Sequence, residues 1–80
     1  TKKLFSATDG VLSIQINAGS QLKEHVTNVP AILVCVIGEV TFENEKGSKE
    51  ILIPGDYVNI ETNVKHWVTA ANDSNLLLIK

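Results

Sequence analysis

Short runs of alternating apolar and polar residues, separated by turn signals, recur along the chain about every 8 to 12 residues. In the clearest run, residues 11–17, Leu12, Ile14 and Ile16 share one face of a predicted strand and polar residues occupy the other. No stretch has the 3.6-residue periodicity of an amphipathic helix. The pattern therefore predicts an all-β sandwich or barrel of about eight short antiparallel strands.

The predicted strands are bounded by residues that favour turns, chiefly glycine, proline, asparagine and aspartate. They cover residues 11–17, 21–27, 31–37, 39–43, 49–53, 56–60, 65–71 and 76–80. We expect strands 21–27 and 31–37 to form a hairpin, which would place His25 opposite Leu33 and Lys23 opposite Cys35. At 80 residues the chain is expected to be one domain, residues 1–80, and since it has no methionine we expect N-terminal residues to be missing.

Charge and apolar run length limit the expected partners. Seven lysines, no arginine and nine acidic residues give a net charge of −2 at pH 7, so nucleic acid is not an expected partner. The longest apolar run, residues 31–38, is too short to span a bilayer and follows no secretory signal, so we expect no membrane partner and a cytoplasmic location. The lone cysteine, Cys35, is interpreted as a small buried hydrophobic residue.

Two predicted strands, residues 31–37 and 76–79, are apolar on both faces. One face of a strand in an antiparallel sheet normally meets water, so something is expected to cover their outer face. The cover could be a second sheet, the N-terminal segment or another subunit. We expect a homodimer with these strands near the interface, and the alternative is a small, tightly curved barrel that covers them itself.

The spacing of several glycines, histidines and their neighbours resembles the two motifs of the cupin superfamily. The first motif is matched by Gly19, His25, Thr27, Ala31 and Gly38, and the second by Gly55, Glu61, Asn63, His66 and Ala70. The turn Pro54-Gly55-Asp56 also resembles the one that opens the second motif, and the two motifs together span residues 19–70. The resemblance to a small single-domain cupin implies a double-stranded β-helix, or jelly-roll barrel, whose interior holds the site.

The same resemblance implies a degenerate metal site. Metal-binding cupins supply two histidines and a glutamate from the first motif and a histidine from the second. The matching residues here are His25, Thr27, Ala31 and His66, so only His25 and His66 are candidate ligands. A first-row metal such as Fe, Mn, Ni or Zn usually takes at least three protein ligands, so no cofactor is firmly implied. In the predicted hairpin Cys35 would lie about 7 to 8 Å from His25, too far for joint ligation.

The candidate ligand-binding residues are His25, His66, Thr27, Leu33 and Tyr57. We expect the barrel to bind a small polar metabolite, such as a sugar or a carboxylate, through two polar groups in an aliphatic lining. One alternative is a metal-dependent dioxygenase or isomerase that uses His25 and His66 with an unrecognised third ligand. Another is a metal-free epimerase or isomerase in which one histidine acts as general base. The histidines could also be structural, hydrogen-bonded to Thr27, Asn63 or water. The fold does not choose among these, and no catalytic residue is assigned.

Overall fold

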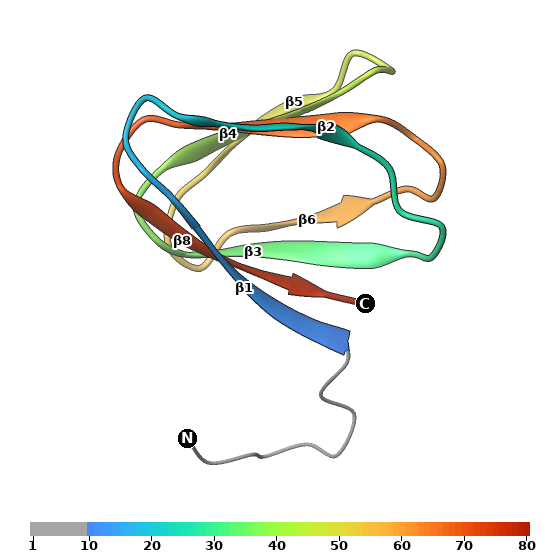
Figure 1. Cartoon of the computed structure of the whole chain (residues 1–80), viewed down its shortest axis with the longest axis horizontal. Coiled ribbons are helices and arrows are strands. Elements are labelled where there is room, and N and C mark those ends of the chain that lie inside the picture. The colour runs from blue at the N-terminus through green and yellow to red at the C-terminus, as the bar shows by residue number, and fades with distance from the viewer. Residues whose placement is uncertain (1–9) are drawn as a thin grey trace.

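The computed structural model describes residues 10–80, and for His25 it describes the backbone alone. The first nine residues of the predicted domain lie outside the described part. Residues 10–80 form eight strands and no α-helix, and the strands build two antiparallel sheets that face each other (Figure 1). The strands are β1 (Val11–Ile16), β2 (Gln21–His25), β3 (Ala31–Ile37), β4 (Val40–Asn44), β5 (Lys49–Leu52), β6 (Tyr57–Ile60), β7 (His66–Ala70) and β8 (Ser74–Ile79). The predicted all-β barrel is confirmed.

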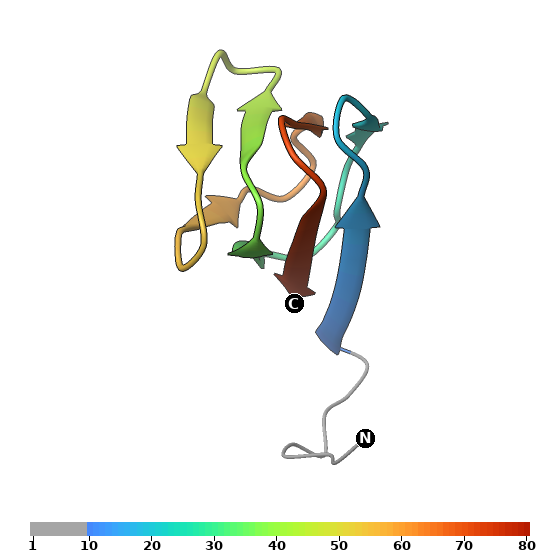
Figure 2. The ribbon, with the colours of Figure 1, turned by 90° about the vertical axis from the view of Figure 1, so that its left-hand side faces the viewer.

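The chain changes sheet at every connection between described strands except the β4–β5 hairpin. One sheet has the order β1-β8-β3-β6 and the other the order β2-β7-β4-β5. Figure 2 shows the first and last strands, β1 and β8, side by side as antiparallel partners in the first of these sheets. This back-and-forth path is that of a jelly roll. In the described residues no helix is long and apolar enough to cross a membrane.

The predicted hairpin between residues 21–27 and 31–37 is wrong, because β2 and β3 belong to different sheets. β2 pairs with β7, whereas β3 lies between β8 and β6. As a result His25 lies opposite His66 instead of Leu33, and Cys35 lies opposite Leu76 instead of Lys23. The wholly apolar β3 takes an inner position in its sheet, while the polar β2 takes an edge. The distance predicted between Cys35 and His25 was derived from this hairpin and therefore no longer applies.

A bulge interrupts β2. Leu22 pairs with Val68 and His25 pairs with His66, so two residues of β2 lie opposite one residue of β7. Leu22 packs against the core and Thr27, just past the end of the strand, is also buried. Uninterrupted alternation would send these two side chains to opposite faces. The bulge therefore shifts the alternation of faces within β2, which ends at His25, two residues before the predicted end at Thr27.

The core lies between the sheets and is almost entirely aliphatic. Among the fully buried side chains the largest is that of Phe42, and Cys35 is buried as predicted. The core residues come from seven of the eight strands: Ile16, Ala31, Leu33, Cys35, Val40, Phe42, Leu52, Ile60, Val68, Ala70, Leu76 and Leu78, with Leu22 packed against them. Leu12, which shares its predicted face with Ile14 and Ile16, is 56% exposed, whereas Ile16 at the other end of β1 is buried.

Candidate functional site at the barrel mouth

Three connections meet at one end of the barrel, on the right of Figure 1. They are the β2–β3 loop (residues 26–30), the β6–β7 loop (residues 61–65) and the tip of the β4–β5 hairpin (residues 45–48). We call this end the mouth. Two residues of the sequence motifs border it, because β2 ends at His25 and β7 begins at His66.

A row of three polar residues crosses the sheet at the mouth. His66 lies opposite His25 on β2 and opposite Asn44 on β4. Paired residues of an antiparallel ladder lie on the same face, with Cα atoms about 4.5 to 5.5 Å apart. The next row inward is apolar, with Val68 between Leu22 and Phe42. Two histidine positions far apart in sequence are thus neighbours, and the adjacent row of Leu22, Val68 and Phe42 is apolar. We call this row the apolar floor.

The ring of His66 is held on two sides. Its Nδ1 lies 3.2 Å from the carbonyl oxygen of Val64, and its ring stacks on Phe42 with centroids 5.7 Å apart at 27°. Because a carbonyl oxygen only accepts hydrogen bonds, Nδ1 carries the hydrogen, and in the neutral ring Nε2 is then the acceptor nitrogen. With 2% of its surface exposed, His66 is a buried polar residue with a fixed ring orientation.

Hydrogen bonds join the β2–β3 and β6–β7 loops. The backbone N–H of Asn63 donates to the carbonyl of Thr27 at 2.8 Å, and Asn63 has a positive φ of 59°, which asparagine tolerates better than most residues. The hydroxyl of Thr27 donates to the carbonyl of Val29 at 2.9 Å. The buried Thr27 therefore bonds to the β6–β7 loop through its carbonyl and to its own loop through its hydroxyl.

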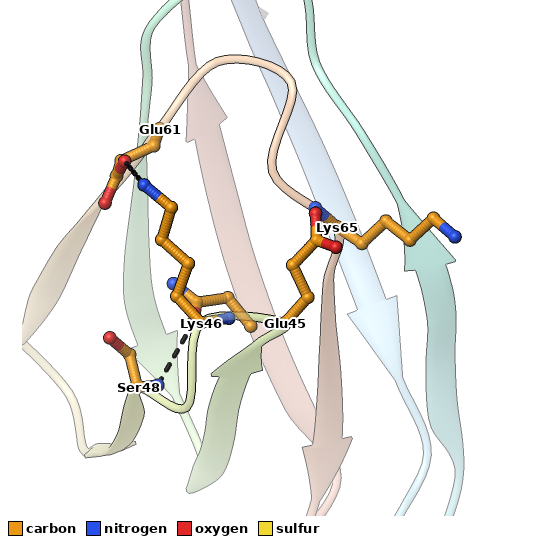
Figure 3. A network of polar contacts seen from close by, with 6 residues as sticks. Glu45, Lys46, Ser48, Glu61 and Lys65 are labelled. Carbon is orange, nitrogen blue, oxygen red and sulfur yellow. Dashed lines mark hydrogen bonds and ion pairs between the residues drawn. The ribbon is translucent and has the colours of Figure 1, made fainter.

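A polar network joins the β4–β5 hairpin to the β6–β7 loop (Figure 3). The carboxylate of Glu45 accepts a hydrogen bond of 2.7 Å from the backbone N–H of Lys65, and the N–H of Glu45 donates to the carbonyl of Lys65. Lys46 and Glu61 form an ion pair of 2.8 Å, and this carboxylate raises the pKa of Lys46. Since both side chains of that pair are 58% exposed, the backbone bonds are the stronger restraint on the loop.

The structure separates the five predicted ligand-binding residues. His25, His66 and Thr27 lie at the mouth, while Leu33 is buried in the core opposite Val58 and Leu78. Tyr57 is 62% exposed and pairs with Val34, so it lies on the outer face of its sheet, opposite to the face that carries Leu33. Only the first three residues are brought together.

The residues that match the metal positions do not fit a resident metal ion. Ala31 offers no donor atom and is packed into the core opposite Ile60, and the hydroxyl of Thr27 is directed to a backbone carbonyl. In the described part of the chain, no group of three or more His, Cys, Asp or Glu side chains could hold an ion. Cys35 belongs to β3, in the sheet opposite to the one that carries His25 and His66, and its sulfur contacts the carbonyls of Ile37 and Gly38.

Three residues that shape the site were not among the predicted set. Val64 supplies the carbonyl that orients His66, Phe42 supplies the stacking ring, and Asn44 completes the polar row. Phe42 lies in the predicted strand 39–43, but its contact with His66 depends on the pairing of β4 with β7. The local pattern of residues does not predict which distant strands pair, so this contact could not be predicted from the sequence.

No protein-family model matches the chain, and no curated protein sequence matches it. Solved structures match its fold closely. A conserved protein of unknown function from Streptococcus pyogenes has a TM-score of 0.81 at 14% identity, over 88% of this chain and 60% of that one. A cupin superfamily protein from Desulfitobacterium hafniense has 0.78 at 16%, over 90% and 77%. The cupin domain of CENP-C from Drosophila melanogaster has 0.80 at 19%, over 98% and 63%.

These similarities show that the chain has the cupin fold, as its two motifs predicted. At identities below 20% they concern the fold alone. The chain spans 60% of the length of the Streptococcus pyogenes protein. Function must therefore be argued from the mouth itself.

Proposed function

We propose that this domain binds a small metabolite with hydroxyl or carboxylate groups at the mouth, and that His25 and His66 recognise it. The observation that carries the proposal is the register that sets His25 directly opposite His66, with the His66 ring fixed through Nδ1. A site that combines an apolar lining with a few well-positioned polar groups is the usual form of a small-molecule pocket.

The chemistry of His66 supports hydroxyl-bearing ligands. With Nδ1 donating to the carbonyl of Val64, the neutral ring can accept a hydrogen bond at Nε2, and a ligand hydroxyl is a suitable donor. When the ring is protonated, Nε2 becomes a donor and suits a carboxylate. Sugars, sugar acids and hydroxy acids meet one or both requirements.

The floor below the row supports a ligand with a carbon skeleton. Leu22, Val68 and Phe42 form the adjacent row inward, and Phe42 and Val68 are almost fully buried. Apolar side chains of this kind exclude water from one side of a bound molecule and strengthen the hydrogen bonds made on the other. A bare inorganic ion would use only the polar half of such a site.

The proposal treats the metal site as degenerate. Two imidazoles without a third protein ligand leave most of the coordination of a first-row ion to water, so a resident ion is not expected to be retained. A metal-dependent dioxygenase or isomerase would need a third ligand in addition to His25 and His66.

Thermal unfolding with added ligands tests the proposal. The probes are glucose, glucuronate, malate and citrate, which separate hydroxyl from carboxylate recognition. At least one of them should raise the Tm of the wild-type domain, since a ligand at 100 times its Kd adds about 2.7 kcal/mol of stability. His66→Asn, which keeps a donor for Val64, and His25→Ala should both abolish the rise. Gln21→Ala, on the exposed part of β2, should leave it unchanged.

Either of two results would overturn this reading of the mouth. In one, none of the four probes stabilises the wild-type domain. In the other, stabilisation persists in both histidine variants, so that the ligand binds elsewhere. Conversion of a bound probe that survives a chelator and is lost in His25→Ala would extend the proposal to a metal-free isomerase or epimerase.

A further inference from the structure

The four strands of the sheet β1-β8-β3-β6 contain no charged residue. Their sequences are VLSIQI, SNLLLI, AILVCVI and YVNI. The strands of the facing sheet carry five charged residues, Lys23, Glu24, Glu43, Lys49 and Glu50. The inward-facing residues of both sheets pack into the same apolar core. The difference in charge therefore concerns the residues that face away from the core.

The strand register defines which residues point outward on the uncharged sheet. Leu33 and Leu78 lie opposite each other in the core, so their neighbours along the chain lie on the outer face. One outward row runs across all four strands through Val11, Ile79, Ile32 and Asn59, and the next through Ser13, Leu77, Val34 and Tyr57. We call these eight residues the uncharged face.

The uncharged face presents large apolar side chains to solvent. Val11 is 43% exposed, Ile79 36% and Tyr57 62%, while Ile32, Val34 and Leu77 between them are half-buried. The outer face of an antiparallel sheet is normally polar when it meets water, and a contiguous exposed apolar patch usually marks an interaction site.

We propose that the uncharged face is the interface of a homodimer, in which it packs against the same face of a second copy. A twofold contact sets one patch against itself, so any charge on it meets a like charge across the axis. A face with no charge at all satisfies that condition. Depletion of charge and the presence of tyrosine are also typical of interface cores.

The surface shape of the uncharged face supports packing against the same face of a second copy. Tyr57, on the edge strand β6, is 62% exposed. A hollow of about 550 Å³ is lined by Ile32, Asn59 and Ile79 of this face and, at its border, by Pro30, Ala31, Ile60 and Lys80. A twofold interface requires each surface to carry both members of every matching pair. Here each copy offers an exposed ring and a largely apolar hollow that could receive one.

The mass of the protein in solution, measured by analytical ultracentrifugation over a range of concentrations, tests the proposal. The wild-type chain should have twice the mass of one chain. Tyr57→Lys and Asn59→Lys should raise the dissociation constant of the dimer about a hundredfold or more, because each sets like charges within a desolvated contact. Ile51→Lys is the matched control: Ile51 is 61% exposed on an edge strand of the other sheet and should leave the dimer intact.

Circular dichroism and thermal unfolding establish whether each variant is folded. If Tyr57→Lys does not fold, Asn59→Lys alone tests whether the uncharged face is the dimer interface. A wild-type chain that stays monomeric at the highest concentration would overturn the proposal and leave the face to residues 1–9 or to a different protein. A dimer broken by Ile51→Lys but kept by Tyr57→Lys and Asn59→Lys would also overturn it. Neither result bears on ligand binding at the mouth.

Discussion

At the scale of single residues, His66 combines a structural and a chemical role. Its Nδ1 donates to the carbonyl of Val64, and its ring covers one side of Phe42. The first contact fixes the start of β7 to the loop before it, and it also determines which ring nitrogen can accept a hydrogen bond. Stability and binding at this position can be separated by the choice of substitution.

We predict that His66→Ala lowers the free energy of unfolding by about 2–4 kcal/mol, since it leaves the Val64 carbonyl without its donor and opens a cavity beside Phe42. His66→Asn should lose distinctly less, because an asparagine amide can donate near the former position of Nδ1. Urea unfolding measures both losses. Equal losses in the two variants would mean that the hydrogen bond to Val64 contributes little.

Cys35 makes stability depend on pH above the neutral range. Burial, and to a lesser degree the negative charge of Asp56, raise the pKa of the Cys35 thiol above its ordinary value of 9.0. Above pH 9 the unfolded chain therefore releases this proton while the folded chain retains it. Ionisation then favours the unfolded chain, so the stability due to the neutral thiol is complete below pH 9 and is lost as the pH rises toward the folded pKa.

We predict that the wild-type domain loses stability relative to Cys35→Val by up to about 1.4 kcal/mol per pH unit above pH 9. Below pH 9 the difference between the two proteins should be constant. Urea unfolding at a series of pH values gives both curves, and lysine ionisation cancels in the comparison. Parallel curves through the alkaline range would show that the folded thiol ionises like an unfolded one.

At the scale of strands, the alternating or apolar runs of the sequence and the turn residues between them were a sufficient guide to position. The strand Ala31–Ile37 begins and ends as predicted, and most other boundaries differ by one or two residues. The signal is local, since the pleat alternates side chains between a dry and a wet face. It fails at β2, where the bulge between Leu22 and His25 changes the faces in the middle of the strand.

Strand pairing could not be read from the same pattern. Residues 21–27 and 31–37 are adjacent in sequence and were predicted to pair, yet each pairs with strands far along the chain. The same limit applies to the site: motif spacing identified His25 and His66, whereas their direct opposition follows from the pairing of β2 with β7. Tyr57 was predicted to bind the ligand, and only the register of β6 locates it on the outer face.

The turn between β3 and β4 depends on Gly38. Its φ is +95°, and a Cβ atom built there would lie 2.5 Å from the carbonyl oxygen of Asp73 and 2.8 Å from the Cα of Ser74. Both neighbours are backbone atoms, Asp73 at the end of the β7–β8 connection and Ser74 at the start of β8, so they cannot move without displacing β8. A side chain at this position conflicts with both the local backbone conformation and the packing of the two connections.

We predict that Gly38→Ala destabilises the domain by at least about 3 kcal/mol, or prevents folding, because it combines an unfavourable φ with a backbone clash. Gly47→Ala is the matched control, since Gly47 has a similar φ of +90° but nothing within 4 Å of the added atom. It should cost only about 1 kcal/mol. Thermal and urea unfolding measure both, and equal losses would show that the clash is relieved without strain.

At the scale of the whole molecule, the two sheets are chemically different. One carries all the charged strand residues and the polar row at the mouth, while the other is uncharged throughout. We interpret the first as the sheet that faces solvent and ligand and the second as the sheet that faces another copy. Cupin barrels support many functions, so this division of roles rests on the residues and not on the fold.

Elemental analysis by mass spectrometry tests the central claim, that the two histidines form an organic-ligand site without a resident metal. The purified protein is offered Fe(II), Mn(II), Ni(II) and Zn(II), dialysed, and compared with His25→Ala treated in parallel. We predict far less than one ion per chain, with no difference between the two proteins. Close to one ion per chain in the wild-type protein, lost in His25→Ala, would contradict the account and place a metal-dependent reaction at the mouth.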